Sequence, residues 1–316
     1  VDKSSSVGDF KILNTPTITI NENESAPVVT LATSATSIAE NAGSSLTLTA
    51  TISQVADEDV IVNLNTSGTS TNGSDYGTLT RITVSAGDLT GTASFTPTDD
   101  STYEGNETAI ISVSTVSGAD ATESGTQSVT ITITENESAP TVTLSSSANS
   151  IAENAGSSLT LTATLSVATT ADVTVGISTS GTGTEGTDYS TISDITISAG
   201  STTGTASFTP TDDSIYEGDE TGIVAISSVS GGSATESGNQ SVTITIDENE
   251  TAPVVNLSIN NSSIAENSDG TITVTATLSF ATIINTTVVL DTSGTATEGT
   301  DYGTISDITI SAGDTT

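Results

Sequence analysis

The chain has no cysteine, histidine, methionine or tryptophan among its 316 residues. These absences exclude disulfide bridges, thiolate or imidazole zinc sites, haem ligation, and catalysis by a cysteine or a serine–histidine pair. Basic residues are scarce as well, because three Lys and Arg stand against 39 Asp and Glu and leave a formal net charge of −36. Phosphates would be repelled, so we expect neither nucleic acid nor an anionic membrane surface as a partner, and cations are the natural ligand.

Aromatic residues make up only 3% of the chain and hydrophobic residues 33%, a composition that by itself permits disorder. No apolar run approaches 18 residues, so direct membrane insertion is not expected. Apolar residues nevertheless alternate with polar ones, mostly threonine, in residues 46–52, 60–64 and 129–133. This alternation is typical of half-buried strands and predicts an ordered all-β fold. We expect a thin core of small side chains, with Phe95 and Tyr103 as its larger members.

The sequence repeats every 113 residues, as the Ala-Pro pairs at Pro27, Pro140 and Pro253 show. Dividing it before each proline predicts the last strand of a preceding repeat in 1–26, complete repeats in 27–139 and 140–252, and the N-terminal part of a third in 253–316. The third stops before its GTASFTPTDD segment, so we expect a window of a longer array. Turn signals space about seven strands over each repeat, which predicts tandem β-sandwiches arranged end to end.

Acidic residues recur at fixed positions of the repeat, in segments expected to be loops or strand edges. Adjacent acids such as Asp99 and Asp100 repel each other unless water or a cation separates them. Their recurrence favours ligands over a merely solvated surface, and calcium suits flexible carboxylate sites better than magnesium does. We expect roughly three or four ions for eight acids. The candidates are Glu40, Asp75, Asp99, Asp100, Glu104, Glu107, Glu135 and Glu137, then Glu153, Asp188, Asp212, Asp213, Glu217, Glu220, Asp247, Glu248 and Glu250.

Several segments, AENAGSSLTLTATIS, GTSTNGSDY, GTGTEGTDY and FTPTDDSTYEGNET, together resemble the Calx-beta repeat of sodium/calcium exchangers, integrin and large bacterial surface proteins. The resemblance spans the chain and implies immunoglobulin-like sandwiches with a calcium cluster in the loops at one end. It places the family's ligands on Glu40, Asp75, Asp99, Asp100, Glu104 and Glu107, and on Glu153, Asp188, Asp212, Asp213, Glu217 and Glu220. The family's closing aspartate run is replaced by TENE at 134–137 and DENE at 247–250. The third repeat keeps Glu266 and Asp301.

The short linkers suggest a mechanical role. If Glu135 and Glu137 share ions with Glu40, Asp75 and the Asp99–Asp100 pair, calcium fixes the angle between successive sandwiches. We therefore expect a calcium-rigidified stalk or filament of a large secreted or cell-surface protein, serving adhesion, with gliding or biofilm attachment as settings. The array resembles a large bacterial surface adhesin, which places it outside the cell. The expected partners are calcium ions, neighbouring repeats and other copies in a filament.

Two other non-enzymatic functions stay open. A regulatory calcium sensor is one, and an ice- or sugar-binding surface built on threonine rows such as Thr47, Thr49 and Thr51 is the other. We do not expect an enzyme. A glycosidase would place two carboxylates in one cleft lined by aromatic platforms, and tandem copies with few aromatics argue against it.

Overall fold

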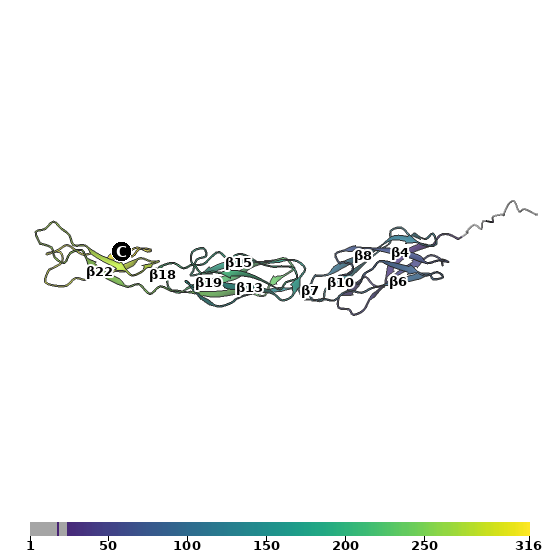
Figure 1. The fold of residues 1–316 in the computed structure, drawn as a ribbon, viewed down its shortest axis with the longest axis horizontal. Coiled ribbons are helices and arrows are strands. Elements are labelled where there is room, and N and C mark those ends of the chain that lie inside the picture. Colours follow the sequence, from purple (N-terminus) through teal and green to yellow (C-terminus); the bar gives the residue numbers. More distant parts are fainter. Residues whose placement is uncertain (1–17, 19–23) are drawn as a thin grey trace, which may run out of the picture. The chain divides into compact units, whose positions relative to one another are not determined.

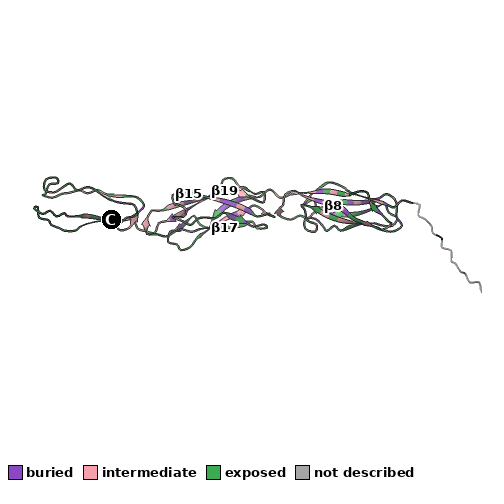
Figure 2. Ribbon diagram, turned by 90° about the horizontal axis from the view of Figure 1, so that it is seen from above, coloured by how far each residue is buried: buried purple, intermediate pink, exposed green. Residues whose placement is uncertain are grey.

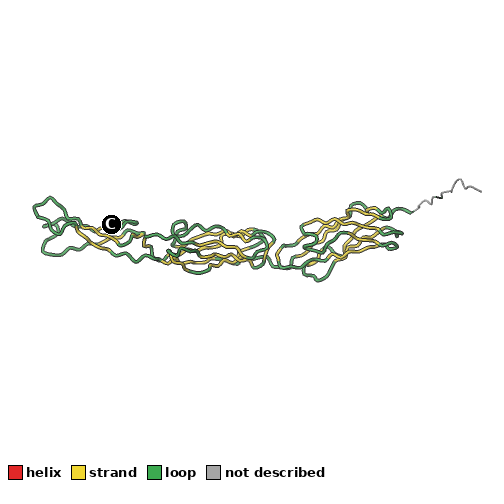
Figure 3. Tube along the Cα trace, in the orientation of Figure 1, coloured by secondary structure: helices red, strands yellow, loops and turns green. Residues whose placement is uncertain are grey.

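The computed structural model describes residue 18 and residues 24–316, and within this part of the chain every regular element is a β-strand (Figures 1 and 3). The all-β class predicted from the alternation is confirmed. The strand expected in 1–26 lies largely outside the described residues. The chain divides into two compact units, Val1–Asp99 with Glu107–Thr134 and Asp100–Asn106 with Glu135–Thr316. Nothing helical in the described residues is long and apolar enough to cross a membrane.

The first unit is a sandwich of two sheets, with strand orders β6-β3-β1-β9 and β2-β10-β8-β4-β5. Among its described residues, seven strands have four or more residues, as the sequence predicts, while β2 and β9 are shorter. Both short strands lie at sheet edges and pair in parallel with β10 and β1. The strands are β1 (Val28–Thr33), β2 (Ser37–Ala39), β3 (Leu46–Ile52), β4 (Val60–Gly68), β5 (Arg81–Val84), β6 (Thr90–Phe95), β8 (Glu107–Ser117), β9 (Thr122–Glu123) and β10 (Ser128–Thr134).

Alternation along each strand separates the core from the surface. In β3, Leu48 and Ala50 are fully buried while Thr47 and Thr51 face solvent. Phe95 fills the core as predicted, and Tyr76 stacks on it with ring centroids 4.6 Å apart. The prediction for Tyr103 is wrong, because this side chain is only half-buried and lies in the second unit. Tyr76, in the loop after β4, occupies the core position that was expected for Tyr103.

The second unit repeats this sandwich with sheets β17-β13-β11-β20 and β12-β21-β19-β15-β16. Buried residues lie along β15 and β19 in Figure 2, Phe208 is buried at the end of β17, and Tyr189 stacks on Phe208 with ring centroids 4.6 Å apart. The strands are β11 (Thr141–Ser146), β12 (Ser150–Ala152), β13 (Leu159–Leu165), β14 (Ala168–Thr169), β15 (Val173–Gly181), β16 (Ile195–Ile197), β17 (Thr203–Phe208), β18 (Ile215–Tyr216), β19 (Glu220–Ser230), β20 (Thr235–Glu236) and β21 (Ser241–Asp247).

The second unit also contains strands from both flanking repeats. Residues from 255 onward form two two-stranded sheets, β22-β23 and β25-β26, around a small core of Ala276, Leu278 and Ile310. Two further pairs join segments from different repeats, β7 with β14 and β18 with β24. The remaining strands are β7 (Thr102–Tyr103), β22 (Val255–Ile259), β23 (Val274–Leu278), β24 (Ala281–Thr282), β25 (Thr286–Val288) and β26 (Ile308–Ile310).

One glycine shows why these strands pack so closely. Gly181 ends β15 with φ of 125°, and a Cβ built there would lie 2.0 Å from the backbone oxygen of Thr221 in β19. Only glycine allows both this backbone conformation and this approach. In the first unit, Gly68 approaches the backbone oxygen of Thr108 just as closely.

Replacing Phe208 with alanine tests the contribution of the aromatic pair. The ring is fully buried, so Phe208→Ala should lower the free energy of unfolding of the second sandwich by about 3–5 kcal/mol. Thr205→Ala, on the exposed face of the same strand, should cost less than about 1 kcal/mol. Denaturant unfolding followed by tyrosine fluorescence measures both. Similar losses in the two variants would contradict this account of the core.

Candidate metal centre

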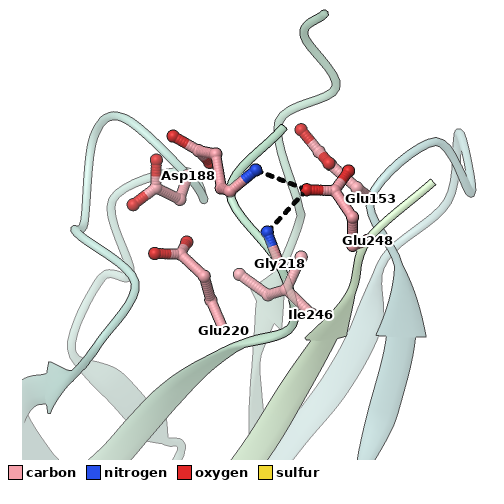
Figure 4. Close-up of a pocket in the computed structure, with 7 residues that line it drawn as sticks. Glu153, Asp188, Gly218, Glu220, Ile246 and Glu248 are labelled. Carbon is pink, nitrogen blue, oxygen red and sulfur yellow. Dashed lines mark hydrogen bonds between the residues drawn. The ribbon is translucent and has the colours of Figure 1, made fainter. Parts of the chain in front are cut away.

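Six carboxylates from separate parts of the repeat gather at one end of the second sandwich, and those that line its pocket, all but Glu250, are drawn in Figure 4. Strand ends at one end of the sheet bring them together. Glu153 follows β12, Glu248 and Glu250 follow the parallel strand β21, and Glu220 begins β19, which runs antiparallel to β21. Asp188 comes from the loop after β15, and Glu217 directly follows β18. A pocket between them is lined by Glu153, Asp188, Glu217, Gly218, Glu220, Ile246 and Glu248.

The six residues form two groups of three. In each group, one carboxylate oxygen from every member lies within 4.8 Å of the other two. Like charges at this distance repel unless protons or a cation intervene. Two oxygens that bind the same calcium ion at 2.3–2.6 Å can lie up to about 5 Å apart, so the spacing suits a shared ion. The groups are Glu153, Glu248 and Glu250, and Asp188, Glu217 and Glu220.

Backbone N–H groups hold Glu248 in place. Its Oε2 accepts hydrogen bonds from the backbone N–H of Glu217 at 2.6 Å and of Gly218 at 2.8 Å (Figure 4). Its Oε1 accepts from the backbone N–H groups of Asn249 and Glu250, both at 2.9 Å. Gly218 has φ of 80°, a conformation that favours glycine, and this turn aims its N–H at the carboxylate. Glu248 therefore fixes the loop that carries Glu217.

Glu153 is a buried residue, and Glu250 is half-buried with one carboxylate oxygen shielded from solvent. Glu153 is 6% exposed, and its Oε1 accepts a hydrogen bond from the backbone N–H of Asp213 at 3.2 Å. The Oε2 of Glu250 is buried and has no hydrogen-bond partner among the described residues. A buried, unsatisfied carboxylate oxygen is costly in a folded protein. A cation bound to the group would satisfy it.

Burial and mutual repulsion shift the acidity of these groups. Burial raises the pKa of Glu153 to about 7, with further increases from Glu248 and Glu250. The pKa values of Glu217 and Glu220 are raised to about 7 as well, mainly by burial and next by repulsion from Asp188. For Glu248, burial acts upward, but the backbone N–H groups outweigh it and bring the pKa to about 2. Without a cation, the raised pKa values leave these three carboxyls of the pocket partly protonated near neutral pH.

Three other acids predicted for this repeat lie outside the two groups. Asp213 turns the loop, because its Oδ1 accepts a hydrogen bond from the backbone N–H of Ile215 at 2.6 Å. Asp247 ends β21 and accepts from the backbone N–H of Glu153 through its own carbonyl at 3.0 Å. Asp212 is exposed and adds negative charge near Glu250, whose pKa is raised first by its neighbour Glu248.

The equivalent residues of the first repeat are divided between the two units, and each set is described by itself. In the first unit, Glu40 is buried after β2, Asp99 is exposed, and Asp75 and Glu107 have oxygens within 4.8 Å of each other.

The second unit holds Asp100, Glu104, Glu135 and Glu137. Glu135 accepts from the backbone N–H groups of Glu104 at 2.6 Å and Gly105 at 2.8 Å, as Glu248 does from its own loop. Oxygens of Glu135 and Glu137 also lie within 4.8 Å of each other. Asp100 accepts from the backbone N–H of Thr102 at 2.6 Å.

In the third repeat, the structure does not place the two candidates in a site. Glu266 and Asp301 are both exposed, and neither belongs to a group of three carboxylates among the described residues. Asp301 instead accepts a hydrogen bond from the backbone N–H of Thr297 at 2.7 Å. The segments that would carry the remaining ligands are not part of residues 253–316.

Sequence reasoning missed three supporting residues. Asp219 accepts the backbone N–H of Glu248 at 3.1 Å, and Asn106 does the same for Glu135 at 3.0 Å. Glu185 accepts the backbone N–H of Ile192 at 2.7 Å and so shapes the loop that carries Asp188. The equivalence of Asp219 and Asn106 is visible in the repeat, since either side chain offers an oxygen at that position.

Comparison with known proteins agrees with the repeated sandwiches. The model of the Calx-beta domain matches residues 22–137, 135–250 and 247–311. The chain belongs to the Calx-beta family. The predicted family and fold class are thereby confirmed, with tandem Calx-beta domains along the chain. No curated protein matches the sequence.

Solved structures that match the chain include two CALX structures and a bacterial integrin-binding protein. CBD12 from CALX1.2 is 15% identical, with 69% of this chain and 99% of that chain covered and a TM-score of 0.30. The calcium binding domain CBD12 of CALX1.1 is 14% identical, with 61% and 77% covered and a TM-score of 0.29. Invasin, the bacterial integrin-binding protein, is 16% identical, with 83% and 50% covered and a TM-score of 0.35.

The raised pKa values predict how stability depends on pH in a chelator. Glu153, Glu217 and Glu220 bind protons more tightly when folded, so their stabilising effect is complete below about pH 4.5 and is lost as pH rises through 7. Glu135 and Glu248, whose pKa values are lowered to about 2, stabilise the fold fully above about pH 4.5, and this contribution is lost only as the pH falls further. The melting temperature in EDTA should therefore fall between pH 5 and pH 8.

Calorimetry on the native chain and on Glu220→Gln measures this dependence. The variant should show a shallower fall, because it loses one of the titrating groups. A melting temperature that stays constant or rises over this range would show that the carboxyls are already ionised in the folded state.

Proposed function

We propose that the acidic loops of these Calx-beta repeats bind calcium ions, and that bound calcium stiffens the chain as a stalk of a large cell-surface or secreted protein. The observation that carries the proposal is the pair of three-carboxylate groups, one of which contains a buried oxygen of Glu250 without a hydrogen-bond partner among the described residues. Membership of the Calx-beta family supports it, because resemblance to that family implies a calcium cluster in the same loops.

The donor set suits calcium in particular. Every candidate ligand of the second repeat is a carboxylate, and the chain has no histidine or cysteine to favour zinc or copper. The candidate ligands come from loops and strand ends, and a carboxylate can bind with one or two oxygens, which suits the variable coordination of calcium better than the strict octahedron of magnesium. Calcium would also neutralise a pocket whose carboxyls otherwise retain protons near pH 7. Two ions for each pair of groups would balance most of the charge of its six carboxylates.

The stiffening role follows from where two of the ligands lie. Glu248 and Glu250 belong to the segment that connects β21 with β22, whereas Glu153 and Glu220 belong to the body of the second sandwich. An ion shared by Glu153, Glu248 and Glu250 would tie this connection to the sandwich. Without the ion, repulsion between the same carboxylates would loosen it. Glu135 and Glu137 occupy the equivalent connection before β11.

The proposed setting is outside a bacterial cell, where the stalk would present an adhesive module. Extracellular calcium is millimolar, so weak sites of this kind remain occupied there. Repeats of one family in tandem, with a strongly acidic surface and no cysteine, suit a spacer better than a regulatory sensor. Calcium, adjoining repeats and other copies in a filament are the partners that this role implies.

Removing one ligand from each group of the second repeat tests calcium binding. Glu153→Gln/Glu220→Gln keeps the shape of both side chains but removes their charge, and it should abolish about half of the calcium bound by the chain. The other half would stay with the first repeat, which has the equivalent acids. Equilibrium dialysis with metal analysis measures the stoichiometry. Asp88→Asn, at an exposed acid outside the groups, should bind as much calcium as the native chain.

Small-angle scattering tests the stiffening separately from binding. The native chain should show a larger radius of gyration and a narrower distribution of dimensions in calcium than in EDTA. The Glu153→Gln/Glu220→Gln variant should respond less, because only its first repeat retains a full set of acids. Calcium binding without any change in scattering would refute the stalk mechanism while leaving the metal site intact.

A further inference from the structure

Successive repeats are joined by short parallel strand pairs within the second unit. Thr102 and Tyr103 of β7 pair with Ala168 and Thr169 of β14 in the next repeat. One repeat later, β18 pairs with β24 in the same register, so that Ile215 lies opposite Ala281 and Tyr216 opposite Thr282. Each repeat thus donates the strand of its Asp-Asp-Ser-x-Tyr-Glu-Gly segment to the sandwich that follows.

The donated strand is held in an extended form by its own repeat. On one side, the backbone N–H of Ile215 donates to Asp213 Oδ1 at 2.6 Å. On the other side, the backbone N–H groups of Glu217 and Gly218 donate to Glu248 at 2.6 and 2.8 Å. Ile215 and Tyr216, the two residues of β18, are therefore preorganised to pair with a neighbouring strand, which lowers the entropic cost of docking.

The receiving edge has the same construction in both pairs. The backbone oxygen of Thr169 accepts the N–H of Gly200 at 2.8 Å, and its hydroxyl donates to the oxygen of Ala171 at 2.7 Å. Thr282 accepts from Gly313 at 2.9 Å and donates to Ile284 at 2.7 Å. In each receiving strand, the threonine oxygen is bonded to the N–H of a turn glycine, and the donated strand pairs along the strand's other side.

The first repeat has this edge without a donated strand. Val55 and Ala56 stand at the position of Ala168 and Thr169, and the oxygen of Ala56 accepts the N–H of Gly87 at 2.9 Å, as in the other repeats. No strand in residues 24–316 pairs with them, and the side chain of Val55 is 55% exposed. We propose that the Val55–Ala56 edge is a docking site for an Asp-Asp-Ser-x-Tyr-Glu-Gly segment of another Calx-beta repeat, which adds to it as a parallel strand.

Charge sets the conditions for this docking. Asp57, Glu58 and Asp59 directly follow the edge, and the donated segment is itself acidic. Asp59 is engaged in its own loop, where Oδ1 accepts the N–H of Ala86 at 2.9 Å, and Glu58 accepts the N–H of Ala119. The remaining repulsion should weaken docking at low ionic strength, so physiological salt is the condition in which to test it. This inference does not depend on calcium binding.

A ladder of two residues binds weakly between separate molecules, whereas a linked repeat gains a high effective concentration. Disulfide trapping detects such weak docking, and the chain has no cysteine of its own. Paired strands lie about 4.8 Å apart, within the Cα separations that a disulfide spans. The probe is a peptide of residues 211–220 with Ile215→Cys, offered to the full chain carrying Val55→Cys in a glutathione redox buffer.

Mass spectrometry should find several-fold more mixed disulfide with this peptide than with a scrambled peptide containing the same cysteine. Leu89→Cys is the matched control, because Leu89 is similarly exposed at 48% but lies outside the edge. The chain carrying Leu89→Cys should form equal amounts of mixed disulfide with the two peptides. The double variant Ile215→Cys/Ala281→Cys should form an internal disulfide across the pair already present. Equal capture of both peptides at Val55→Cys, or failure of the internal pair to form, would overturn the proposal.

Discussion

Repulsion between carboxylates that the fold itself brings together is the constraint on which the structure of the second repeat depends. Sheet geometry leaves little freedom, because Glu153 and Glu248 directly follow the ends of β12 and β21, and Glu220 is the first residue of β19. The pocket can respond only by taking up protons, by using backbone N–H groups or by binding a cation. The first response appears in Glu217, with a pKa near 7, and the second in Glu248, with a pKa near 2. The third response is the proposed function.

Much of the fold could be predicted from alternation alone. Leu48 and Ala50 are buried between exposed threonines because a strand with one buried face needs a period of two. Tyr76 and Tyr103 could not be told apart in this way, since neither lies in a long strand. Tyr76 reaches Phe95 from a loop, while Tyr103 pairs with the next repeat, and both outcomes depend on contacts distant in sequence.

The candidate site could be predicted as a set of positions but not as an arrangement. Recurrence in register made Glu153, Glu217 and Glu248 candidates, and in the structure all three line one pocket. It could not distinguish acids that face the pocket from Asp213, whose carboxylate turns the loop. Both kinds recur, since a loop needs its turn residues as much as its ligands. The assignment of Asp219 to the support of Glu248 likewise needed the backbone geometry.

The sequence repeat and the compact unit do not coincide, and the difference affects how the site works. Residues 100–106 belong to the first repeat by sequence but to the second unit by contact, because β7 pairs with β14. One repeat later, β18 pairs with β24 and is followed at once by Glu217 and Gly218, whose N–H groups bind Glu248. The same short segment therefore carries a candidate ligand and the strand that joins two repeats. Ordering the carboxylates around it would also order that strand, so the proposed metal binding and the pairing of the repeats would act on one structural element.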